Sequence, residues 1–552
     1  MVMANAAAPG RQGLDARAAR YDYVIVGSGA AGAILANRLS ADGSSVCLLE
    51  SGPPDHSIFL HIPVGFVKAV FNPKYAWQFT TEASPLTHGR RIPIPQGRTL
   101  GGSTSINGLV YNRGQRADYD HWEALGNPGW SYKDVLPYFK SMERRVGGDD
   151  TYRGRKGELA VSDIDWIHPL CEAFIQGAVD EGLPRNQDYN GEDQAGVGYF
   201  QRTIDGGLRV STARAFLRPV KSRKNLHIHT YAHATRIIFE GKKAVGVAYV
   251  HSIRRDAERC IAANKRVIVA CGAINTPRLL QLSGVGPAEV LQAHGIPVVH
   301  ALPGVGENLT DHYSVRLVAK VKGAQTMNEL VKGVNLGGQI SRWLLRRPSI
   351  MALSPSLVHY FWKSDDTLDA PDLQGVFTPA SYKEGYVGVL DDFPGMTAGV
   401  WQHRPTSKGY VRIQSADVFQ DPIIQPNYLA DEQDQQTLVR GVRLARRLLQ
   451  SKALAPYFDK ETLPGPMCES DDELLDFAKR YGVSSYHVNG TAHMGPASDP
   501  MAVVDADLRV HGLEHLSVVD SSIMPAMPSA NVSAATMMIA NKAADIILKQ
   551  QV

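Results

Sequence analysis

Cysteine is scarce in this sequence, and the few that occur show no pattern. The 552 residues contain five, Cys47, Cys171, Cys260, Cys271 and Cys468, which are far apart and include no C-x-x-C pair. An odd number of widely spaced cysteines is not typical of a disulfide framework or of a zinc site. We therefore expect reduced thiols, no metal site and a reducing compartment, the cytoplasm.

The sequence also lacks a long block of one charge and a long uninterrupted apolar run. The formal net charge is only +3, which argues against a nucleic-acid partner. Residues 1–20 are rich in alanine and arginine without a continuous apolar core, so we expect a flexible tail and no secretory signal. The charge-free stretch 521–541 is interrupted by Pro525 and Pro528, which predicts buried core and at most peripheral membrane association.

Length and composition indicate a large globular protein with more than one domain. The hydrophobic content of 44% and the charged content of 20% are ordinary for a soluble globular chain. A chain of 552 residues is too long for one hydrophobic core, so two or more domains are expected, either sequential or interleaved.

The most informative stretch is 23–50, in which an apolar run, a glycine-rich turn, a helical pattern and a second apolar run follow one another. In the turn, Gly27 permits a tight bend, Gly29 lets the backbone approach a pyrophosphate, and Gly32 lets the helix pack close to the strand. The helix N-terminus offers unpaired N–H groups to an anion, and Glu50 can accept from a ribose hydroxyl. The pattern predicts dinucleotide binding and is compatible with both NAD and FAD.

A second glycine-rich segment, 96–108, favours neither helix nor strand. Its glycines and hydroxyl side chains are suited to a collar of backbone donors around a ligand. A surface turn rich in small residues is an equally good interpretation of this segment alone.

The rest of the chain shows several periodic segments. Residues 115–145 are expected to be helical, and strands are expected at 156–163, 225–230, 235–239, 244–250, 265–270 and 516–519. After the strand 265–270, Thr276 can cap a helix whose first position is Pro277. This unit predicts a second crossing of the same parallel sheet, with a crossover that contacts no ligand as the alternative.

Three further helices are expected. The pattern at 334–347 predicts a core helix, with a lid or a membrane-surface helix as alternatives. Residues 431–450 have an apolar face, acids in the first turns and arginines in the last, as the helix dipole favours. A third helical run, 534–547, follows Asn531.

These segments together resemble the glucose-methanol-choline (GMC) family of FAD oxidoreductases, most closely its choline-dehydrogenase-like alcohol dehydrogenase branch. The resemblance covers nearly the whole chain from Tyr21 and rests on five blocks in order. The blocks are 27–32 with Glu50, 97–114, 272–286, 303–312, and 486–495 followed by 520–547.

The resemblance implies that the dinucleotide is FAD. The collar then holds the pyrophosphate and flavin, Ala234 lies against the adenine, and Asp520 with Ser521 meets the cofactor at a strand end. The full set of expected cofactor-binding residues is Gly27, Gly29, Ala30, Ala31, Gly32, Glu50, Arg98, Gly101, Gly102, Ser103, Asn107, Ala234, Gly272, Asp520, Ser521 and Val532. Some members attach the flavin through a histidine in the collar, where this chain has Ile106, so noncovalent FAD is expected.

The reaction implied by the resemblance is oxidation of a primary alcohol to the aldehyde. The α-hydrogen leaves as hydride to the flavin N5 while a base takes the hydroxyl proton. By resemblance His487 is that base, and Asn531 hydrogen-bonds the same oxygen. The chain departs from many relatives at Val488, Ala492 and His493, so substrate preference does not transfer, and His493 either adds charge near the site or has a surface role.

The expected fold is α/β, a Rossmann-like FAD-binding domain with an interleaved substrate-binding domain formed by a sheet covered by helices. The FAD-binding domain is assigned to 21–170, 207–315 and 485–552, and the substrate-binding domain to 171–206 and 316–484. The electron acceptor is expected to be oxygen or a quinone-like molecule.

Two other functions are compatible with the sequence. The first is a same-fold flavoenzyme without net oxidation, of the hydroxynitrile lyase or light-driven fatty-acid decarboxylase type. The second is a protein that holds FAD structurally. The presence of both His487 and Asn531 favours alcohol oxidation.

Overall fold

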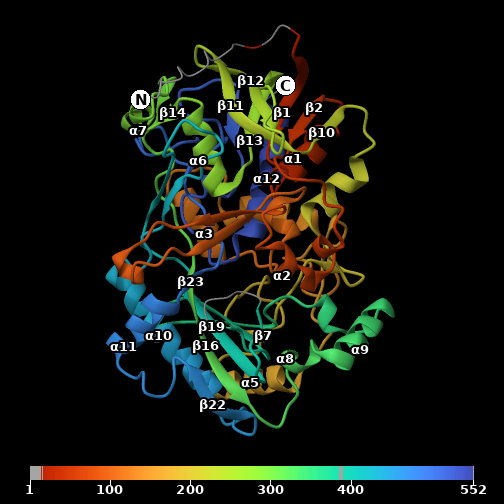
Figure 1. The fold of residues 1–552 in the computed structure, drawn as a ribbon, viewed down its shortest axis with the longest axis vertical. Helices are drawn as coiled ribbons and strands as arrows, with labels where there is room; N and C mark the ends of the chain where they lie inside the picture. Colours follow the sequence, from red (N-terminus) through yellow and green to blue (C-terminus); the bar gives the residue numbers. More distant parts are fainter. Residues whose placement is uncertain (1–13, 15–16, 384–388, 551–552) are drawn as a thin grey trace, which may run out of the picture.

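The computed structural model describes residues 14, 17–383 and 389–550. The chain forms two parts stacked along the long axis of the molecule, and each part is built on one seven-stranded sheet (Figure 1). The tail expected over 1–20 lies largely outside the described residues, and Ala19 and Arg20 already belong to the first strand.

The first sheet is the expected dinucleotide-binding sheet. Its order is β10 (Leu226–His229), β2 (Val46–Leu49), β1 (Ala19–Val26), β13 (Arg259–Val269), β12 (Lys243–His251) and β11 (Ala232–Glu240), and β24 (Leu516–Val518) pairs with the end of β13. Strands β10, β2, β1, β13 and β24 are parallel, whereas β12 and β11 are antiparallel. The predicted second crossing is confirmed, because β13 lies directly beside β1.

Two helices from opposite ends of the chain pack together on this sheet. They are α1 (Gly32–Leu39), which follows the glycine turn, and α12 (Val532–Lys549). Ile34 and Leu35 of α1 join Met538 and Ile539 of α12 in one fully buried cluster with the strands. The prediction that the charge-free stretch before and within α12 is buried core is therefore confirmed.

The helix after β13 begins earlier than predicted. α6 spans Gly272–Leu282, so Pro277 lies inside it and Thr276 is not its cap. The cause is distant in sequence, because Asp520 accepts hydrogen bonds from the Gly272 N–H (2.8 Å) and the Thr276 hydroxyl (2.6 Å). Pro277 cannot donate to the carbonyl of Ala273, and the hydroxyl of Thr491 donates to that carbonyl instead (2.6 Å).

The second sheet is entirely antiparallel. Its order is β22 (Phe458–Leu463), β16 (Tyr313–Val321), β19 (Gly395–Gln402), β18 (Leu373–Thr378), β17 (Val358–Trp362) and β7 (Gly196–Tyr199), and β23 (Val483–Ser484) also pairs with β16. Helices α5 (Pro169–Asp180), α10 (Glu432–Leu449) and α11 (Asp471–Tyr481) share one hydrophobic core with it. The residues of β16 therefore alternate between this core and the opposite face of the sheet.

Helix α10 matches its prediction to within a residue at each end. The side chain of Asp431 caps it by accepting from the Gln433 N–H (2.8 Å), and its apolar face, which includes Leu438, Val442 and Leu448, is buried. An amphipathic pattern with charged ends was sufficient to place this helix.

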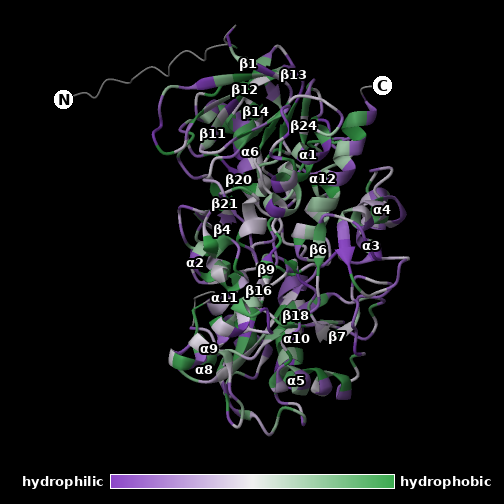
Figure 2. Cartoon of the chain, turned by 90° about the vertical axis from the view of Figure 1, so that its right-hand side faces the viewer, coloured by the Kyte–Doolittle hydropathy of each residue, from purple (hydrophilic) through white to green (hydrophobic). Residues whose placement is uncertain are grey.

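Helix α9 (Gly333–Leu344) is not the core helix that its pattern predicted. It projects from the side of the second part of the molecule and carries both hydrophobic and hydrophilic residues (Figures 1 and 2). All of its residues are at least partly exposed, with Val334 91% and Leu344 68% exposed. The Trp343 indole N–H anchors the helix by donating to the Gly207 carbonyl (2.9 Å).

Shorter elements complete the two parts. The helical stretch expected at 115–145 consists of α3 (Arg116–Ala124) and α4 (Tyr132–Met142), and the strand expected at 156–163 is only β6 (Leu159–Val161). The remaining helices and turns are η1 (Ile58–Leu60), η2 (Pro63–Gly65), α2 (Phe66–Ala69), η3 (Pro85–Thr87), η4 (Gly102–Ser105), η5 (Ala213–Leu217), η6 (Arg218–Val220), α7 (Ala288–Ala293), α8 (Met327–Leu330), η7 (Ile350–Ala352) and η8 (Ser521–Ile523). The remaining strands are β3 (Ala76–Thr80), β4 (Pro93–Gly97), β5 (Glu143–Arg145), β8 (Ile204–Asp205), β9 (Leu208–Arg209), β14 (Val285–Gly286), β15 (His300–Ala301), β20 (Tyr410–Arg412) and β21 (Ile423–Gln425).

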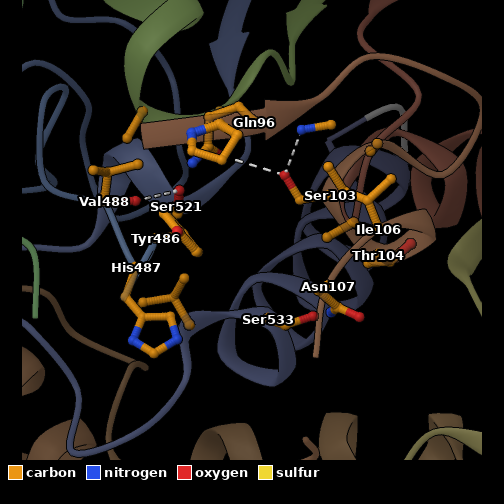
Figure 3. A pocket seen from close by; sticks show the side chains of 18 of the residues that line it. Gln96, Ser103, Thr104, Ile106, Asn107, Tyr486, His487, Val488, Ser521 and Ser533 are labelled. Carbon is orange, nitrogen blue, oxygen red and sulfur yellow. Dashed lines mark hydrogen bonds between the residues drawn. The ribbon is translucent and has the colours of Figure 1, made fainter. Parts of the chain in front are cut away.

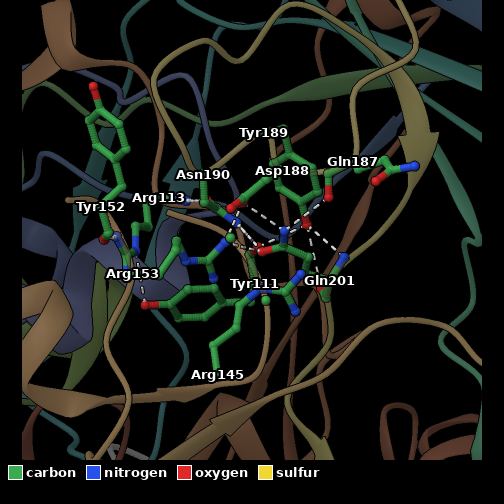
Figure 4. Close-up of polar contacts among 12 residues, drawn as sticks. Tyr111, Arg113, Arg145, Tyr152, Arg153, Gln187, Asp188, Tyr189, Asn190 and Gln201 are labelled. Atoms are coloured by element: carbon green, nitrogen blue, oxygen red, sulfur yellow. Dashed lines mark hydrogen bonds and ion pairs between the residues drawn. The ribbon is translucent and has the colours of Figure 1, made fainter. Parts of the chain in front are cut away.

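A buried ionic network joins segments of the two parts. Glu143 is fully buried and binds the guanidinium groups of Arg113 (2.5 Å) and Arg153. Arg153 also pairs with Asp188 and donates to the side chain of Gln201 (2.8 Å), which leads toward β7 (Figure 4). The network ties 113–153 to 188–201 through charges that have little access to water.

The hydrophobic clusters support the proposed division into two domains, with one departure. Buried apolar residues of 164–200, 313–400 and 428–478, together with Ile92, share the core of the second sheet, and those of the first sheet have a separate core. The hairpin β20–β21, however, packs against α6, because Val411 and Ile424 cluster with Ala273 and Ile274. We therefore propose that this hairpin belongs with the FAD-binding part.

Candidate active site

A cavity of about 390 Å³ lies between the two parts. The first part contributes the glycine turn, the collar, the start of α6 and the start of α12. The second part contributes the face of β16, β18 and β19 that is turned away from the helices. Figure 3 shows Ser103, Ile106 and Asn107 on one side of the cavity and Tyr486 and His487 on the other.

The glycine turn 27–32 places the start of α1 directly beside the cavity. A Cβ on Gly32 would lie 1.8 Å from the Gly27 carbonyl oxygen, so this helix could not pack as closely with any other residue. The first turn of α1 contains no acid, and its cap position, Ala31, makes no side-chain hydrogen bond. The Ala33, Ile34 and Leu35 N–H groups donate to the carbonyls of Gly29 and Ala31. The place for an anion such as the FAD pyrophosphate is therefore the turn just before them, residues 29–32.

Glu50 is held at the end of β2. Its carboxylate accepts from the Ser28 hydroxyl (2.6 Å), the Ser28 N–H (3.1 Å) and the Gly52 N–H (2.8 Å). Burial raises the pKa of Glu50, and these hydrogen bonds oppose the rise. With its oxygens directed by Ser28 and Gly52, Glu50 lines the cavity in a fixed position, as a ribose acceptor requires.

The glycine-rich segment 96–108 forms part of the cavity wall, which favours the collar over the surface turn. A Cβ on Gly102 would lie 2.7 Å from the Cα of Gly29, so the collar contacts the glycine turn directly. The Ser103 hydroxyl accepts from the Gly97 N–H (3.0 Å), and the Asn107 carbonyl oxygen accepts from Arg209 (2.7 Å). The two glycine-rich segments thus form one continuous surface.

Most of the expected cofactor-binding residues line this cavity. They are Gly27, Gly29, Ala30, Ala31, Glu50, Gly102, Ser103, Asn107, Ala234, Gly272, Asp520, Ser521 and Val532. The other three stand behind the wall. Gly32 packs α1 onto the turn, Gly101 adopts a left-handed conformation that starts η4, and Arg98 lies 4.4 Å over the ring of Trp77, which itself lines the cavity.

The two expected catalytic residues meet at the cavity wall. The Asn531 side-chain Nδ2 lies 2.9 Å from Nε2 of His487, although 44 residues separate them in sequence. The Gln374 amide donates to the Asn531 carbonyl oxygen (3.2 Å), which orients the Asn531 NH₂ group toward His487. Both side chains are half-buried and line the cavity.

A chain of hydrogen bonds determines which nitrogen of His487 carries the proton. Nε2 of His312 lies 2.7 Å from the carbonyl oxygen of His403, so this nitrogen is the N–H donor. Burial lowers the pKa of His312 to about 4, so the ring is neutral and its Nδ1 is an acceptor. This Nδ1 lies 2.9 Å from Nδ1 of His487, which must therefore be the donor. The unprotonated nitrogen of His487 is Nε2, which faces Asn531.

His487 remains neutral and is anchored through its backbone. Its removal from bulk water lowers the pKa of His487 well below the usual value, and His312 adds to this effect. The Asp311 carboxylate accepts from the His487 N–H (2.8 Å), and the Ser484 and Tyr428 hydroxyls donate to the same carboxylate (2.5 Å each). Tyr486, directly before His487, adopts a left-handed conformation (φ 64°) that these contacts stabilise.

Sequence reasoning did not identify Asp311 and His312 as site residues. They are adjacent, lie at the end of the block 303–312 and precede β16. Two polar residues directly before an apolar strand were the available signal. The partner they contact, His487, is distant in sequence, so their role required the fold.

Of the three departures in the loop 486–495, Val488 lines the cavity, whereas Ala492 and His493 do not. Val488 and Ala492 are buried in hydrophobic clusters. Nε2 of His493 lies 3.1 Å from a carboxylate oxygen of Asp499, and its ring is outside the cavity lining. A structural role for His493 is therefore favoured over added charge at the site.

The fold and this geometry agree with comparisons to known proteins. The family model described as GMC oxidoreductase matches residues 21–314 with its N-terminal part and 405–540 with its C-terminal part. The chain belongs to the GMC oxidoreductase family. It is an FAD-dependent oxidoreductase of CH–OH donors, which confirms the predicted fold class, cofactor and reaction class.

Individual relatives are similar over nearly the whole chain. An alcohol dehydrogenase (acceptor) from Pseudomonas putida is 40% identical over 534 residues, 96% of each chain. An oxygen-dependent choline dehydrogenase from Photobacterium profundum is 39% identical over 96% of this chain and 93% of its own. Among solved structures, pyridoxine 4-oxidase from Mesorbium loti has a TM-score of 0.86 and 30% identity, and the match covers 95% of this chain and 98% of that one.

Proposed function

We propose that the chain oxidises a primary alcohol to the aldehyde, with Nε2 of His487 as the base. The supporting observation is the hydrogen-bond order from His403 through His312 to His487. This order leaves the lone pair on the one ring nitrogen that faces Asn531 and the cavity. A base must be unprotonated before it can accept a proton, and the lowered pKa of His487 provides that form at neutral pH.

In this proposal His487 and Asn531 bind one oxygen together. The substrate hydroxyl takes the place of the Asn531 NH₂ group at Nε2 of His487 and donates to it, and the same oxygen accepts from Nδ2 of Asn531. His312 and Asp311 keep the imidazole ring and its backbone in place while the proton moves to Nε2. The glycine turn and collar would hold FAD, and bound FAD would supply the acceptor for the hydride that leaves the substrate carbon.

The cofactor is proposed to be noncovalent. Ile106 is 4% exposed, packs with Leu60 and Val70, and offers no nucleophile or base to the flavin side of the cavity. Acid precipitation should therefore release the yellow chromophore into the supernatant.

Replacing the base tests the proposal. His487→Ala should keep FAD bound and reduce the flavin at least about 100-fold more slowly under anaerobic alcohol, because positioned general-base catalysis contributes that much or more. The matched control is His493→Ala, which changes a histidine of the same loop outside the cavity and should leave flavin reduction within about 2-fold of wild type. A His487→Ala protein that bleaches its flavin at the wild-type rate would show that His487 is not the base.

The same experiment distinguishes alcohol oxidation from the two alternative functions. A non-oxidative flavoenzyme or a structural FAD protein would show no flavin bleaching by any alcohol in the wild-type chain. The His487–Asn531 pair favours oxidation, since the two side chains lie close enough to bind one substrate oxygen together.

The acceptor, the compartment and membrane contact belong to the same proposal. Oxygen or a quinone-like molecule would serve as the electron acceptor, and a cytoplasmic setting is supported by five cysteines that are all free. In the part of the chain that the structure describes, none of the helices is long and apolar enough to cross a membrane. The exposed apolar residues of α9 are compatible with peripheral contact.

A further inference from the structure

The cavity wall formed by the second sheet carries a cation and lacks a carboxylate. Arg316 lies on β16 and lines the cavity, as do Thr378 of β18 and Gly399 and Trp401 of β19. Among the described lining residues the acids are Glu50 and Asp520, and both belong to the dinucleotide end, where N–H and hydroxyl groups already bind them. The substrate side of the cavity is therefore positively charged.

The Arg316 guanidinium is uncompensated. The side chain is half-buried, and no acid or hydrogen-bond acceptor in the described part of the chain binds it. The guanidinium carbon lies 6.0 Å from the centroid of the Tyr382 ring. The neighbouring hydroxyls are engaged elsewhere, since Thr378 donates to the Pro355 carbonyl (2.9 Å) and Thr397 to the Ala380 carbonyl (2.7 Å). Arg316 keeps its five donors for a ligand.

Arg316 is within electrostatic reach of the catalytic loop. Burial raises the pKa of Tyr486 to about 12, and the positive charge of Arg316 opposes that rise. Tyr486 directly precedes His487, so a molecule held at the base also experiences the field of Arg316. In this partly dehydrated cavity that field is weakened less than it would be in water.

A second unused donor lies on the same wall. Trp401 is 6% exposed and its indole N–H has no partner among the described residues. Its ring centroid is 6.2 Å from that of His487. Trp401 pairs with Ser314 in the sheet, and Gly399 pairs with Arg316, so the two donors occupy neighbouring positions.

We propose that the alcohol oxidised by this chain carries a carboxylate remote from its hydroxyl, and that Arg316 binds this carboxylate. The proposal rests on the alcohol oxidation argued above and adds the substrate class. A guanidinium and a carboxylate form paired, charge-assisted hydrogen bonds, which are the strongest contact available to an arginine. A quaternary ammonium alcohol is disfavoured, because its charge would lie beside Arg316 without a compensating acid.

The sheet geometry indicates how far apart the two substrate groups are. Arg316 is four residues beyond His312, which contacts the base. At a rise of about 3.3 Å per residue, the Cα atoms of His312 and Arg316 are on the order of 13 Å apart. Side chains stand roughly perpendicular to a sheet, so a substrate that reaches both the base and Arg316 needs several bonds between its hydroxyl and its carboxylate. An ω-hydroxy acid fits this spacing, whereas an α-hydroxy acid is too short.

Three probes of similar size test the charge preference in the FAD-loaded enzyme. Anaerobic flavin reduction is measured with 6-hydroxyhexanoate, 1-hexanol and choline. We expect the highest kcat/KM for 6-hydroxyhexanoate and the lowest for choline. Arg316→Gln should lower kcat/KM for 6-hydroxyhexanoate by about 10- to 100-fold, the range for a lost charged hydrogen bond, and leave 1-hexanol within about 3-fold. Arg316→Lys, which keeps the charge, should recover part of the loss.

Binding of a carboxylate that cannot be oxidised tests the role of Arg316 without relying on turnover. Hexanoate has the carboxylate but no hydroxyl, and we expect it to perturb the visible flavin spectrum of the wild-type protein and not that of Arg316→Gln. Lys320→Gln is the matched control, because Lys320 lies on the same strand but outside the cavity lining. It should behave as wild type in both assays.

The outcomes distinguish this proposal from the one on which it rests. If 1-hexanol bleaches the flavin but 6-hydroxyhexanoate is no better and Arg316→Gln changes nothing, alcohol oxidation stands and the role of Arg316 is wrong. If none of the three probes bleaches the flavin, alcohol oxidation is wrong, and hexanoate binding still decides whether Arg316 holds a carboxylate.

Discussion

At the scale of single residues, the proposed catalytic histidine, His487, depends on a second histidine that does not itself reach the cavity lining. His312 is fully buried and positions His487 through the contact between their Nδ1 atoms. If His312 could not accept this hydrogen bond, His487 would be free to place its proton on Nε2, where the proposed base needs a lone pair.

Replacing His312 tests this positioning role. His312→Phe should keep FAD bound and lower the rate of flavin reduction by about 10- to 100-fold, since a buried hydrogen bond is lost and the wrong tautomer becomes populated. His312→Asn, whose side-chain oxygen can accept, should recover part of the rate. The measurement is anaerobic stopped-flow reduction with the FAD content of each variant recorded. Equal rates in His312→Phe and His312→Asn would contradict the tautomer argument.

The residues of the site differ in how far the sequence could predict them. The glycine turn and Glu50 were predicted because their spacing reflects the geometry of one ligand-binding turn, whereas the collar 96–108 was assigned to the cofactor by resemblance. His487 and Asn531 came from resemblance, since nothing local distinguishes His487 from the other histidines. His312 and Arg316 were missed because their roles depend on strands and loops that meet only in the fold.

At the scale of elements, the sequence pattern predicted where a helix occurs better than it predicted which other segments contact that helix. Helix α10 was placed correctly because its charged ends and apolar face act within the helix itself. The start of α6 was misplaced because Asp520, more than two hundred residues away, binds Gly272 and Thr276. Helix α9 has an amphipathic pattern, but a pattern does not show whether a neighbour covers the apolar face.

The exposure of α9 predicts an unusual tolerance to polar substitution. The double variant Leu344→Gln with Leu345→Gln should change the melting temperature by no more than about 1–2 °C, because these side chains are already 68% and 67% exposed. The matched control is Leu448→Gln in α10, where the side chain is fully buried and a polar replacement should destabilise by several degrees. Differential scanning fluorimetry compares the three proteins. A large loss in the double variant would mean that the apolar side chains of α9 are covered in solution.

At the scale of the whole molecule, the cavity lies where two separately packed cores meet, so the contacts between the two parts also hold the site together. The Glu143 network is one such contact, because it joins residues near α4 to the segment that leads into β7. Burial alone would raise the pKa of Glu143, but Arg113 and Arg153 more than offset this and hold it below its usual value. The folded state therefore favours the ionised form.

Glu143→Gln should destabilise the protein by about 3–5 kcal/mol at neutral pH, because two buried guanidinium groups lose their common counter-charge. A carboxyl group whose pKa is depressed by folding contributes stability above its unfolded pKa, and that stability is lost as pH falls. The gap in unfolding free energy between wild type and variant should thus be largest near pH 7 and shrink below about pH 4. Glu82→Gln, which breaks the exposed pair with Arg91, is the control and should cost less than about 1 kcal/mol. Urea unfolding of the FAD-loaded proteins measures both, and a pH-independent gap would mean that the charge of Glu143 does not stabilise the junction.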